Sequence, residues 1–537
     1  MVRIHRWGTG PFPPVVTGAI APKSLEEARV LAAVRSATLL GVEGRLVTVE
    51  VHVATGLPAF QIVGLPDEAC RESRDRVRAA VLSSGLRWPA MRMTVNLAPS
   101  SQRKGGSGLD LAIAVGVLAA SNQVPVGAIE DLAFIAELGL NGTLRGVAGI
   151  APMVASLLSA SPDLRPVVAM SSFREAEGVA GGLVRVAETL AALVAALNAE
   201  APWPRPPDEE LVDDAPFLPD LADVRGQLAA RNALEIAAAG GHHLLLIGPP
   251  GSGKTMLAQR VPGLLPALDA AVALQATMVH SAAGVRLPAG GLVRRAPFRA
   301  PHHSSSMVSL VGGGSTALRP GEISLAHGGV LFLDELGEFS PVVLDGLRQP
   351  LEEGVIRLAR ARASASMPAK FLLVAATNPC PCGGGRPGAC ECDDAARSRY
   401  LRRLSGPLLD RFDLRVGVDR PDVDDLLSAG GGEPSAVVAA RVAHARRAAL
   451  DRIGMLNADI PGGRLDVLAP LDDDARRLLR QQLETDALTG RGYHRIRRVA
   501  RTVADLLDAD ELVRADHVAL ALQLRVRLRL STKGRVA

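Results

Sequence analysis

The segment best suited to chemistry is a glycine-rich loop that follows a short apolar run, LLLI. It matches the pattern G-x-x-x-x-G-K-[ST], in which backbone N–H groups wrap the phosphates of a nucleotide. Lys254 is placed to reach the β- and γ-phosphates, and the hydroxyl of Thr255 is placed to hold Mg²⁺. We therefore expect ATP and Mg²⁺ here rather than an empty glycine-rich turn. The eight loop residues are Gly248, Pro249, Pro250, Gly251, Ser252, Gly253, Lys254 and Thr255.

Carboxylates for the same site end a later apolar run, at Asp334 and Glu335. We expect Asp334 to bind Mg²⁺ or to lie just outside its ligands, and Glu335 to polarise the attacking water. Asn378 ends the next apolar run and could hold that water or the γ-phosphate. An acidic strand end that merely caps a helix is the less favoured alternative so soon after a phosphate loop.

Arg411, in the segment PLLDRFD, could reach the nucleotide of a neighbouring subunit. Such an arginine stabilises the charge that spreads over a transferring phosphoryl group. The alternative is a surface arginine paired with Asp410 or Asp413. The sequence by itself leaves both interpretations open.

Four of the five cysteines form the pattern C-x-C-x7-C-x-C, at Cys380, Cys382, Cys390 and Cys392. Four thiolates can close a tetrahedral Zn²⁺ site of the structural kind. A loop of reduced thiols is the alternative, because C-x-C pairs are less typical than C-x2-C. We favour zinc, and we expect Cys70 to be a small buried residue.

Composition bounds the class of protein. The 537 residues suggest two to four domains, and 48% apolar with 22% charged residues exclude disorder throughout. The net charge of +4 permits a nucleic-acid partner. No apolar run reaches the ~18 residues of a membrane span. No secretory signal is visible either, so we expect a cytoplasmic protein without a membrane partner.

The chain divides at changes of composition. Residues 1–33 are a proline-rich extension whose order we leave open, and residues 34–200 form an N-terminal domain. Residues 201–220 hold six prolines and six acidic residues and are the clearest linker. Residues 221–420 alternate strands and helices, which predicts a parallel sheet covered on both faces, with the cysteines as an insertion at 380–392. Residues 421–537 have only helical patterns.

Periodicity predicts the elements that position these residues. We expect strands at Leu46–Val53, Met93–Leu97, His243–Ile247, Val330–Leu333 and Phe371–Ala375. We expect helices at Arg71–Leu82, Leu109–Ala120, Val224–Ala239, Met256–Arg260, Ala436–Leu450 and Arg495–Leu507.

The motifs taken together resemble those of AAA+ ATPases, and within them the magnesium-chelatase-like group and its ComM/YifB family. The resemblance covers about residues 36 to 530. The segments that carry it include GLPAFQIVGLPD (56–67), PFRAPHHSSS (297–306), RPGEISLAHGGVLFLDELGEF (319–339) and GPLLDRFDL (406–414), besides the phosphate loop. The family is understood as hexameric ring motors, and its competence members as DNA helicases that drive branch migration in homologous recombination. The resemblance therefore implies an AAA+ P-loop core with a helical lid, an ATPase and a homo-oligomeric ring acting on DNA.

The resemblance also assigns roles to basic residues. Arg491 lies where this clade has its second sensor arginine, with Arg495 as the fallback and a basic helix face as the alternative. Residues 353–370 resemble the hairpin of related helicases that enters the ring pore and follows the DNA backbone. Arg360 holds the pore position, flanked by Arg357 and Arg362, although a solvated hairpin is an equal alternative from the residues alone. The PFRAPHHSSS segment is expected to form another pore-facing loop.

The N-terminal domain resembles the α+β fold of the Lon protease domain, which is like ribosomal S5 domain 2. The residues of proteolysis are missing, because the nucleophile position falls on Gly108 beside Ser107 and the base position holds Ala151. We expect a non-proteolytic DNA-binding or assembly module. A magnesium-chelatase-type subunit for metal insertion is the alternative function, and an ATP-dependent protease is the third class.

Overall fold

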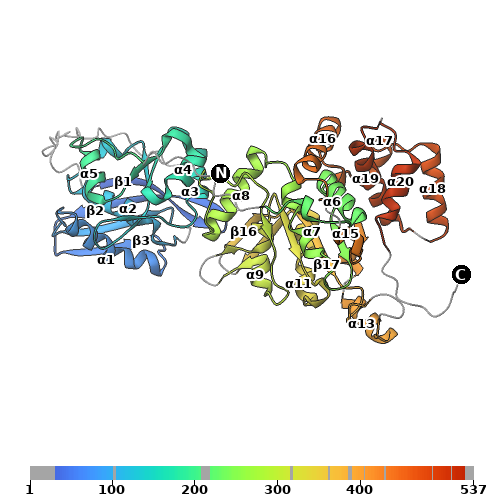
Figure 1. The fold of residues 1–537 in the computed structure, drawn as a ribbon. Coiled ribbons are helices and arrows are strands. Elements are labelled where there is room, and N and C mark those ends of the chain that lie inside the picture. The colour runs from blue at the N-terminus through green and yellow to red at the C-terminus, as the bar shows by residue number, and fades with distance from the viewer. Residues whose placement is uncertain are drawn as a thin grey trace, which may run out of the picture.

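The computed structural model describes residues 31–100, 104–206, 218–314, 318–360, 363–384, 390–403, 406–427, 431–486, 488–509 and 511–526. These residues form an N-terminal α/β part, a central α/β part and a C-terminal helical part, which follow one another along the molecule (Figure 1). Strand β1 begins at Leu31, so the last three residues of the predicted extension belong to a strand. No described helix is both long and apolar enough to cross a membrane.

The N-terminal part is built on a seven-stranded sheet with the order β3-β4-β2-β1-β5-β8-β9. β1 pairs antiparallel with β2, and β2 with β4, whereas β5, β8 and β9 continue the sheet in parallel from β1. β3 is added in parallel at the outer edge of β4. The bounds are β1 (Leu31–Leu40), β2 (Glu43–Ala54), β3 (Ala59–Val63), β4 (Arg92–Ala98), β5 (Leu132–Ile135), β8 (Arg165–Ala169) and β9 (Arg185–Ala187), with a small hairpin β6 (Glu137–Leu138) and β7 (Leu144–Arg145).

Helices cover both faces of this sheet. α2 (Asp110–Ala120) is buried along its whole length and packs in one core with α1 (Glu68–Ser83) and α5 (Leu190–Leu197). α3 (Ile150–Ala160) and α4 (Phe173–Ala180) pack in a second core on the other face. A helix that is apolar all round must be enclosed, which explains why α2 shows no polar stripe in the sequence.

The central part holds a five-stranded sheet with the order β11-β14-β17-β10-β18, all parallel. The bounds are β10 (Leu244–Ile247), β11 (Phe298–Arg299), β14 (Val330–Leu333), β17 (Leu372–Thr377) and β18 (Leu414–Gly417). Alternate residues of β10 enter two different cores, as Leu244 and Leu246 face one side and Leu245 and Ile247 the other. This confirms the predicted parallel sheet with two covered faces.

One face of the central sheet is covered by α6 (Leu228–Gly240) and α7 (Lys254–Ala258), together with helices from the C-terminal part. The other face is covered by α8 (Ala270–Ala283), α10 (Glu322–Leu325), α11 (Pro341–Gly346) and neighbouring short elements. Those elements are α9 (Met307–Val311), β12 (Gly312–Gly313), β13 (Arg319–Pro320) and α12 (Arg348–Glu353). The predicted helix at 224–239 starts later, because Gly226 and Gln227 have left-handed backbone conformations.

A hairpin of β15 (Val355–Arg360) and β16 (Ala363–Pro368) leaves the central part, as the family resemblance implies for residues 353–370. α13 (Asp394–Arg403) and α14 (Gly406–Leu409) precede β18, and α13 lies at the periphery of the central part (Figure 1). The C-terminal part is helical in its described residues: α15 (Val423–Leu427), α16 (Ser435–Ile453), α17 (Leu465–Leu468), α18 (Asp473–Glu484), α19 (Gly490–Leu506) and α20 (Ala515–Gln523).

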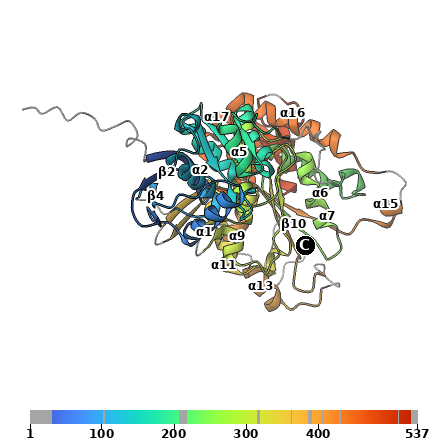
Figure 2. The same ribbon diagram turned by 90° about the vertical axis from the view of Figure 1, so that its left-hand side faces the viewer.

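The N-terminal and central parts contact each other at several places in the described residues, and Figure 2 views the molecule from the N-terminal side. The turn between β1 and β2 reaches the hairpin, where Val42 is buried in the central core with Ala365 and Met367. At the start of α3, the N–H of Gly149 donates to the carbonyl of Ser281 over 3.0 Å.

Candidate nucleotide-binding site

The phosphate loop lies at the carboxyl end of β10, the strand between β17 and β18, and leads directly into α7. Gly251 and Gly253 have φ values of 75° and 87°, which side chains with a Cβ rarely adopt. A Cβ on Gly248 would lie 2.0 Å from the carbonyl oxygen of Val418. Glycine at these positions is therefore a steric requirement of the loop.

Lys254 is buried inside this loop at 9% exposure. Its Nζ donates to the carbonyls of Gly248 and Pro249, both over 2.8 Å, and to Oδ1 of Asn378 over 3.4 Å. Burial lowers the pKa of Lys254, and the carboxylates of Asp334 and Glu335 oppose that shift. The ammonium group thus stands on the inner wall of the loop, at the level of the strand that ends in Asn378.

The loop fits a phosphate group. The buried hydroxyl of Ser252 has no hydrogen-bond partner among the described residues. A buried polar atom without a partner is rare, and phosphate oxygens would satisfy it. The start of α7 adds the positive end of a helix, which attracts anions.

Thr255 and Asp334 face each other at the mouth of the loop, where the threonine hydroxyl donates to Oδ2 over 2.6 Å. The other carboxylate oxygen accepts from the N–H of Glu335 over 2.9 Å. A hydroxyl and a carboxylate at this separation are oxygen ligands of the kind that Mg²⁺ prefers. These two residues therefore form the part of the site that could hold the metal.

Glu335 has a φ of 52°, a strained value for a residue with a side chain. Oε2 of Glu335 lies 3.3 Å from Nδ1 of His303. His302 and His303 line a cavity of about 290 Å³ together with Thr255 and Asp334. His302 and His303 therefore lie beside the carboxylates of the nucleotide site, and the pore-facing position expected for their segment stays a prediction.

Arg411 lies at the amino ends of the sheet's strands, whereas the phosphate loop lies at their carboxyl ends. Arg411 precedes β18, whose first residue Leu414 lies beside Leu244 and whose last residue lies beside the end of β10. The length of β18, roughly 10 Å, separates the two ends. The side chain forms an ion pair with Glu352, the last but one residue of α12, and not with Asp410 or Asp413. Within one chain, Arg411 and Lys254 thus lie on different sides of the central part.

Positive charge gathers around Arg411. Burial lowers its pKa first, and the cations Arg495, Arg491 and Arg348 lower it further. Its Nε is buried without a hydrogen-bond partner among the described residues. A guanidinium in such surroundings gains from an additional anion.

The two sensor candidates differ sharply in exposure. The Arg491 side chain is 73% exposed, with Nη1 3.9 Å from Oδ2 of Asp410. The Arg495 side chain, 14% exposed, forms an ion pair with Asp413 at 2.5 Å and donates to the carbonyl of Arg411 over 3.1 Å. Burial alone would raise the pKa of Asp413, but its hydrogen bond with His242 and the charge of Arg495 lower it. The structure gives the fallback Arg495 a structural ion pair and leaves Arg491 accessible, on the same side as Arg411.

Two of the three hairpin residues expected to touch DNA lie on β15, Arg357 in the middle of the strand and Arg360 at its end. Arg360 is the last residue of β15 and pairs in register with Ala363. Arg357 forms an ion pair with Glu353. Arg362 lies outside the described residues.

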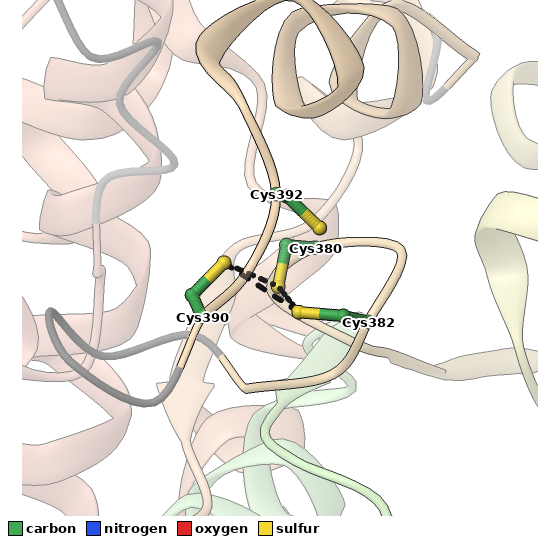
Figure 3. A group of neighbouring side chains, drawn as sticks. All are labelled: Cys380, Cys382, Cys390 and Cys392. Carbon is green, nitrogen blue, oxygen red and sulfur yellow. Dashed lines mark hydrogen bonds between the residues drawn. The ribbon is translucent and has the colours of Figure 1, made fainter.

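The four clustered cysteines come together after Asn378 (Figure 3). The sulfur of Cys380 lies 3.4 Å from those of Cys382 and Cys390, and these two lie 3.5 Å apart. All four sulfurs lie within 4.8 Å of one another and could hold a metal ion such as Zn²⁺. The pKa of Cys382 is lowered to about 6, chiefly by the hydrogen bond from the N–H of Gly384. Cys70 is fully buried, as expected, and burial raises its pKa to about 12.

The N-terminal domain places no nucleophile beside a lysine in its described residues. The Ser107 hydroxyl donates to the carboxylate of Glu137, and buried Lys104 donates to the carbonyl of Pro99. The N–H of Ala151, at the start of α3, donates to Oε1 of Glu175 over 2.7 Å. None of these contacts pairs a serine hydroxyl with a lysine amine, as the proteolytic mechanism requires.

Comparison with known proteins defines the class. The family model described as "Magnesium chelatase, subunit ChlI" matches residues 220–426. "Subunit ChlI of Mg-chelatase" matches 49–168, and "Magnesium chelatase, subunit ChlI C-terminal" matches 432–525. With the phosphate loop and the parallel sheet, these matches define a magnesium-chelatase-like protein of the AAA+ ATPase class.

Relatives define the family more closely. The chain is 43% identical over 510 residues to "Competence protein ComM" of Haemophilus influenzae, covering 94% of this chain and 99% of the relative. It is 41% identical over 502 residues to "Uncharacterized protein YifB" of Escherichia coli, covering 93% and 98%. An uncharacterized protein of Mycobacterium tuberculosis is 45% identical over 500 residues, covering 91% and 97%. The chain belongs to the ComM/YifB family.

Sequence reasoning misses three contacts of the site: His303 with Glu335, Glu352 with Arg411, and Tyr400 with Thr377, whose hydroxyl oxygens lie 3.1 Å apart. The paired histidines of PFRAPHHSSS are a signal for the first, but the resemblance places that segment in the pore. Neither Glu352 nor Tyr400 has a local pattern that could reveal its partner.

Proposed function

We propose that this chain is an ATP-driven ring motor acting on DNA, a helicase that promotes branch migration in homologous recombination or natural transformation. The observation that carries the proposal is the position of Lys254 and Arg411 at opposite ends of the strands of one sheet. The phosphate loop and Arg411 lie on different sides of the chain. The nucleotide site of one chain can therefore receive this arginine only from a neighbouring chain. Repeating that contact closes a ring, and we propose a hexamer.

Hydrolysis follows from the placement of the side chains. Lys254 and the loop N–H groups bind the β- and γ-phosphates. Thr255 and Asp334 would hold Mg²⁺, which would neutralise phosphate charge. Glu335 accepts a proton from the water, whose oxygen attacks the γ-phosphorus in line. The bond to the bridging oxygen breaks, and ADP leaves with the electron pair.

The neighbouring residues complete this arrangement. Asn378 orients the water or the γ-phosphate from the end of β17. Arg411 of the adjacent subunit neutralises the charge that develops on the phosphoryl oxygens, and Arg491, exposed on the same side, assists it. Arg411 must exchange Glu352 for the nucleotide when the ring forms.

DNA is the proposed polyanion in the pore. Arg357, Arg360 and Arg362 on and around the β15–β16 hairpin would contact phosphates, which supply affinity without sequence information. That property suits a motor that must move over any sequence. The name of the Haemophilus relative, a competence protein, agrees with a role in DNA uptake and recombination.

The remaining assignments follow from this function. ATP and Mg²⁺ are the cofactors of the motor, and Zn²⁺ is the occupant of the cysteine cluster. The N-terminal domain, with its Lon-like fold, is a non-proteolytic DNA-binding or assembly module. The cytoplasm, where DNA and ATP meet, is the proposed compartment.

A second candidate is the ATPase subunit of a magnesium-chelatase-type complex, because the three matching models carry that description. The two functions differ in whether DNA stimulates ATP hydrolysis. We would measure ATPase activity of the purified chain with and without four-way and forked DNA, at stated salt. Strong stimulation supports the motor. A chain that stays monomeric with nucleotide, or whose hydrolysis ignores branched DNA, contradicts it.

A further inference from the structure

The cysteine loop touches the nucleotide site directly. Cys380 follows Asn378 by two residues, and Asn378 contacts Lys254. A Cβ on Gly383 would lie 2.5 Å from Cδ of Pro250, so the loop is packed against the phosphate loop itself. A displacement of the cysteine loop would therefore also displace the phosphate loop and Asn378.

Helix α13, which follows the cysteine loop, contacts the strand that ends in Asn378 and the segment that carries Glu335. Tyr400 on α13 is 5% exposed and its hydroxyl lies 3.1 Å from that of Thr377, the residue before Asn378. A Cβ on Gly337 would lie 2.7 Å from the ring of Tyr400, and Gly337 is two residues beyond Glu335. The segment from Cys380 to Tyr400 thus contacts the phosphate loop, the carboxylate segment and the strand that ends in Asn378.

The sequence of the loop offers little apolar side-chain area. The stretch CPCGGGRPGACEC has one alanine, two prolines and four glycines between its thiols. Ordering a glycine-rich segment costs much conformational entropy. A cross-link among the sulfurs would offset that cost.

The sulfur positions suit one metal ion. Zn–S bonds of about 2.3 Å in a tetrahedron place sulfurs roughly 3.8 Å apart. The separations of 3.4–3.5 Å among three of them and the 4.8 Å limit for all four bracket that value. Figure 3 shows the four sulfurs turned toward a common centre.

We propose that Cys380, Cys382, Cys390 and Cys392 bind one structural Zn²⁺, and that the zinc-closed loop braces the phosphate loop, Asn378 and Glu335 for ATP binding. This inference rests on the proposed function only in that it concerns the same nucleotide site. The four thiols lose their protons when the ion binds. All four ligands come from the protein, so the zinc has no catalytic role.

The test begins with zinc content, measured by elemental mass spectrometry on the full chain purified under reducing conditions. We expect one zinc per chain, none in C390S/C392S, and one in the control C70A. A wild-type chain without zinc, or with disulfides among these cysteines by mass, overturns the proposal.

The second measurement is the affinity for a fluorescent ATP analogue. Zinc-free C390S/C392S should bind it on the order of tenfold more weakly, because small displacements at such a site are costly. An unchanged affinity overturns the brace.

Because the variant could unfold locally, wild-type zinc is also removed with a thiol-reactive mercurial and a chelator, and then restored after reduction. Affinity should fall and return with zinc. If the affinity for the ATP analogue does not change when zinc is removed, the proposal is overturned. These readouts need neither DNA nor a ring, so a failure of DNA stimulation would contradict the motor and leave the zinc brace standing.

Discussion

His303 Nδ1 lies 3.3 Å from Oε2 of Glu335, although 31 residues separate the two along the chain. Glu335 is held in a left-handed backbone conformation directly after Asp334. A carboxylate that must orient water gains from a partner that limits its rotamers. The contact makes His303 a positioning residue for Glu335 under the proposed function.

Replacing this histidine tests the contact. We expect His303→Ala to lower kcat for ATP hydrolysis about tenfold, because Glu335 loses its partner, with a much smaller change in ATP affinity. His303→Gln, which restores a donor near the carboxylate, should recover part of the loss. Steady-state hydrolysis and equilibrium ATP binding separate the two effects, and an unchanged kcat in His303→Ala would contradict the role.

Binding and hydrolysis should separate between two further variants. Lys254→Ala removes the cation of the phosphate loop and should abolish measurable ATP binding. Glu335→Gln keeps the shape of the side chain but cannot accept a proton, so it should bind ATP and lose about 10²- to 10⁴-fold in hydrolysis. Normal turnover by Glu335→Gln would show that another group activates the water.

Arg411 and Lys254 should complement each other between chains. Arg411→Ala alone should lose ~10³–10⁵-fold in hydrolysis, as in systems with a comparable arginine. Mixing it with Lys254→Ala should restore part of the activity, because some interfaces then combine an intact loop with an intact arginine. Titrating one variant into the other measures this. A mixture no more active than its components contradicts a shared site.

Buried histidines should make the fold sensitive to mild acid. Burial, with a smaller effect of Lys370, lowers the pKa of His327 to about 4, and its Nδ1 accepts the N–H of Lys370 over 3.1 Å. The unfolded chain takes up this proton near pH 6.5, so the folded state should lose stability as pH falls from about 6.5 toward 4.

The slope is the quantity to compare. In that window His327 contributes about 1.4 kcal/mol per pH unit. Urea unfolding at several pH values should show a shallower dependence for His327→Gln than for the wild type. Equal slopes would mean that His327 takes up its proton at the same pH in the folded and unfolded states, which would contradict the lowered pKa.

Local patterns determined much of this protein. The phosphate loop, the ends of β14 and β17 and the mainly apolar α2 follow from residues close together in the sequence, since turn chemistry and periodicity act over a few residues. The hairpin was implied by the family resemblance. The carboxyl ends of neighbouring parallel strands meet at one edge of a sheet, so the sequence alone suffices to place Asp334 and Asn378 beside Lys254.

Only the tertiary structure decided the partners that come from separate segments. The direction of β18 put Arg411 at the amino ends of the strands, away from Lys254 and beside Glu352, and the path of PFRAPHHSSS brought His303 to Glu335. The packing of Gly383 on Pro250 depends on how a glycine-rich loop folds back. Such contacts join residues whose spacing carries no period, because chain topology and side-chain packing, and not local propensity, determine them.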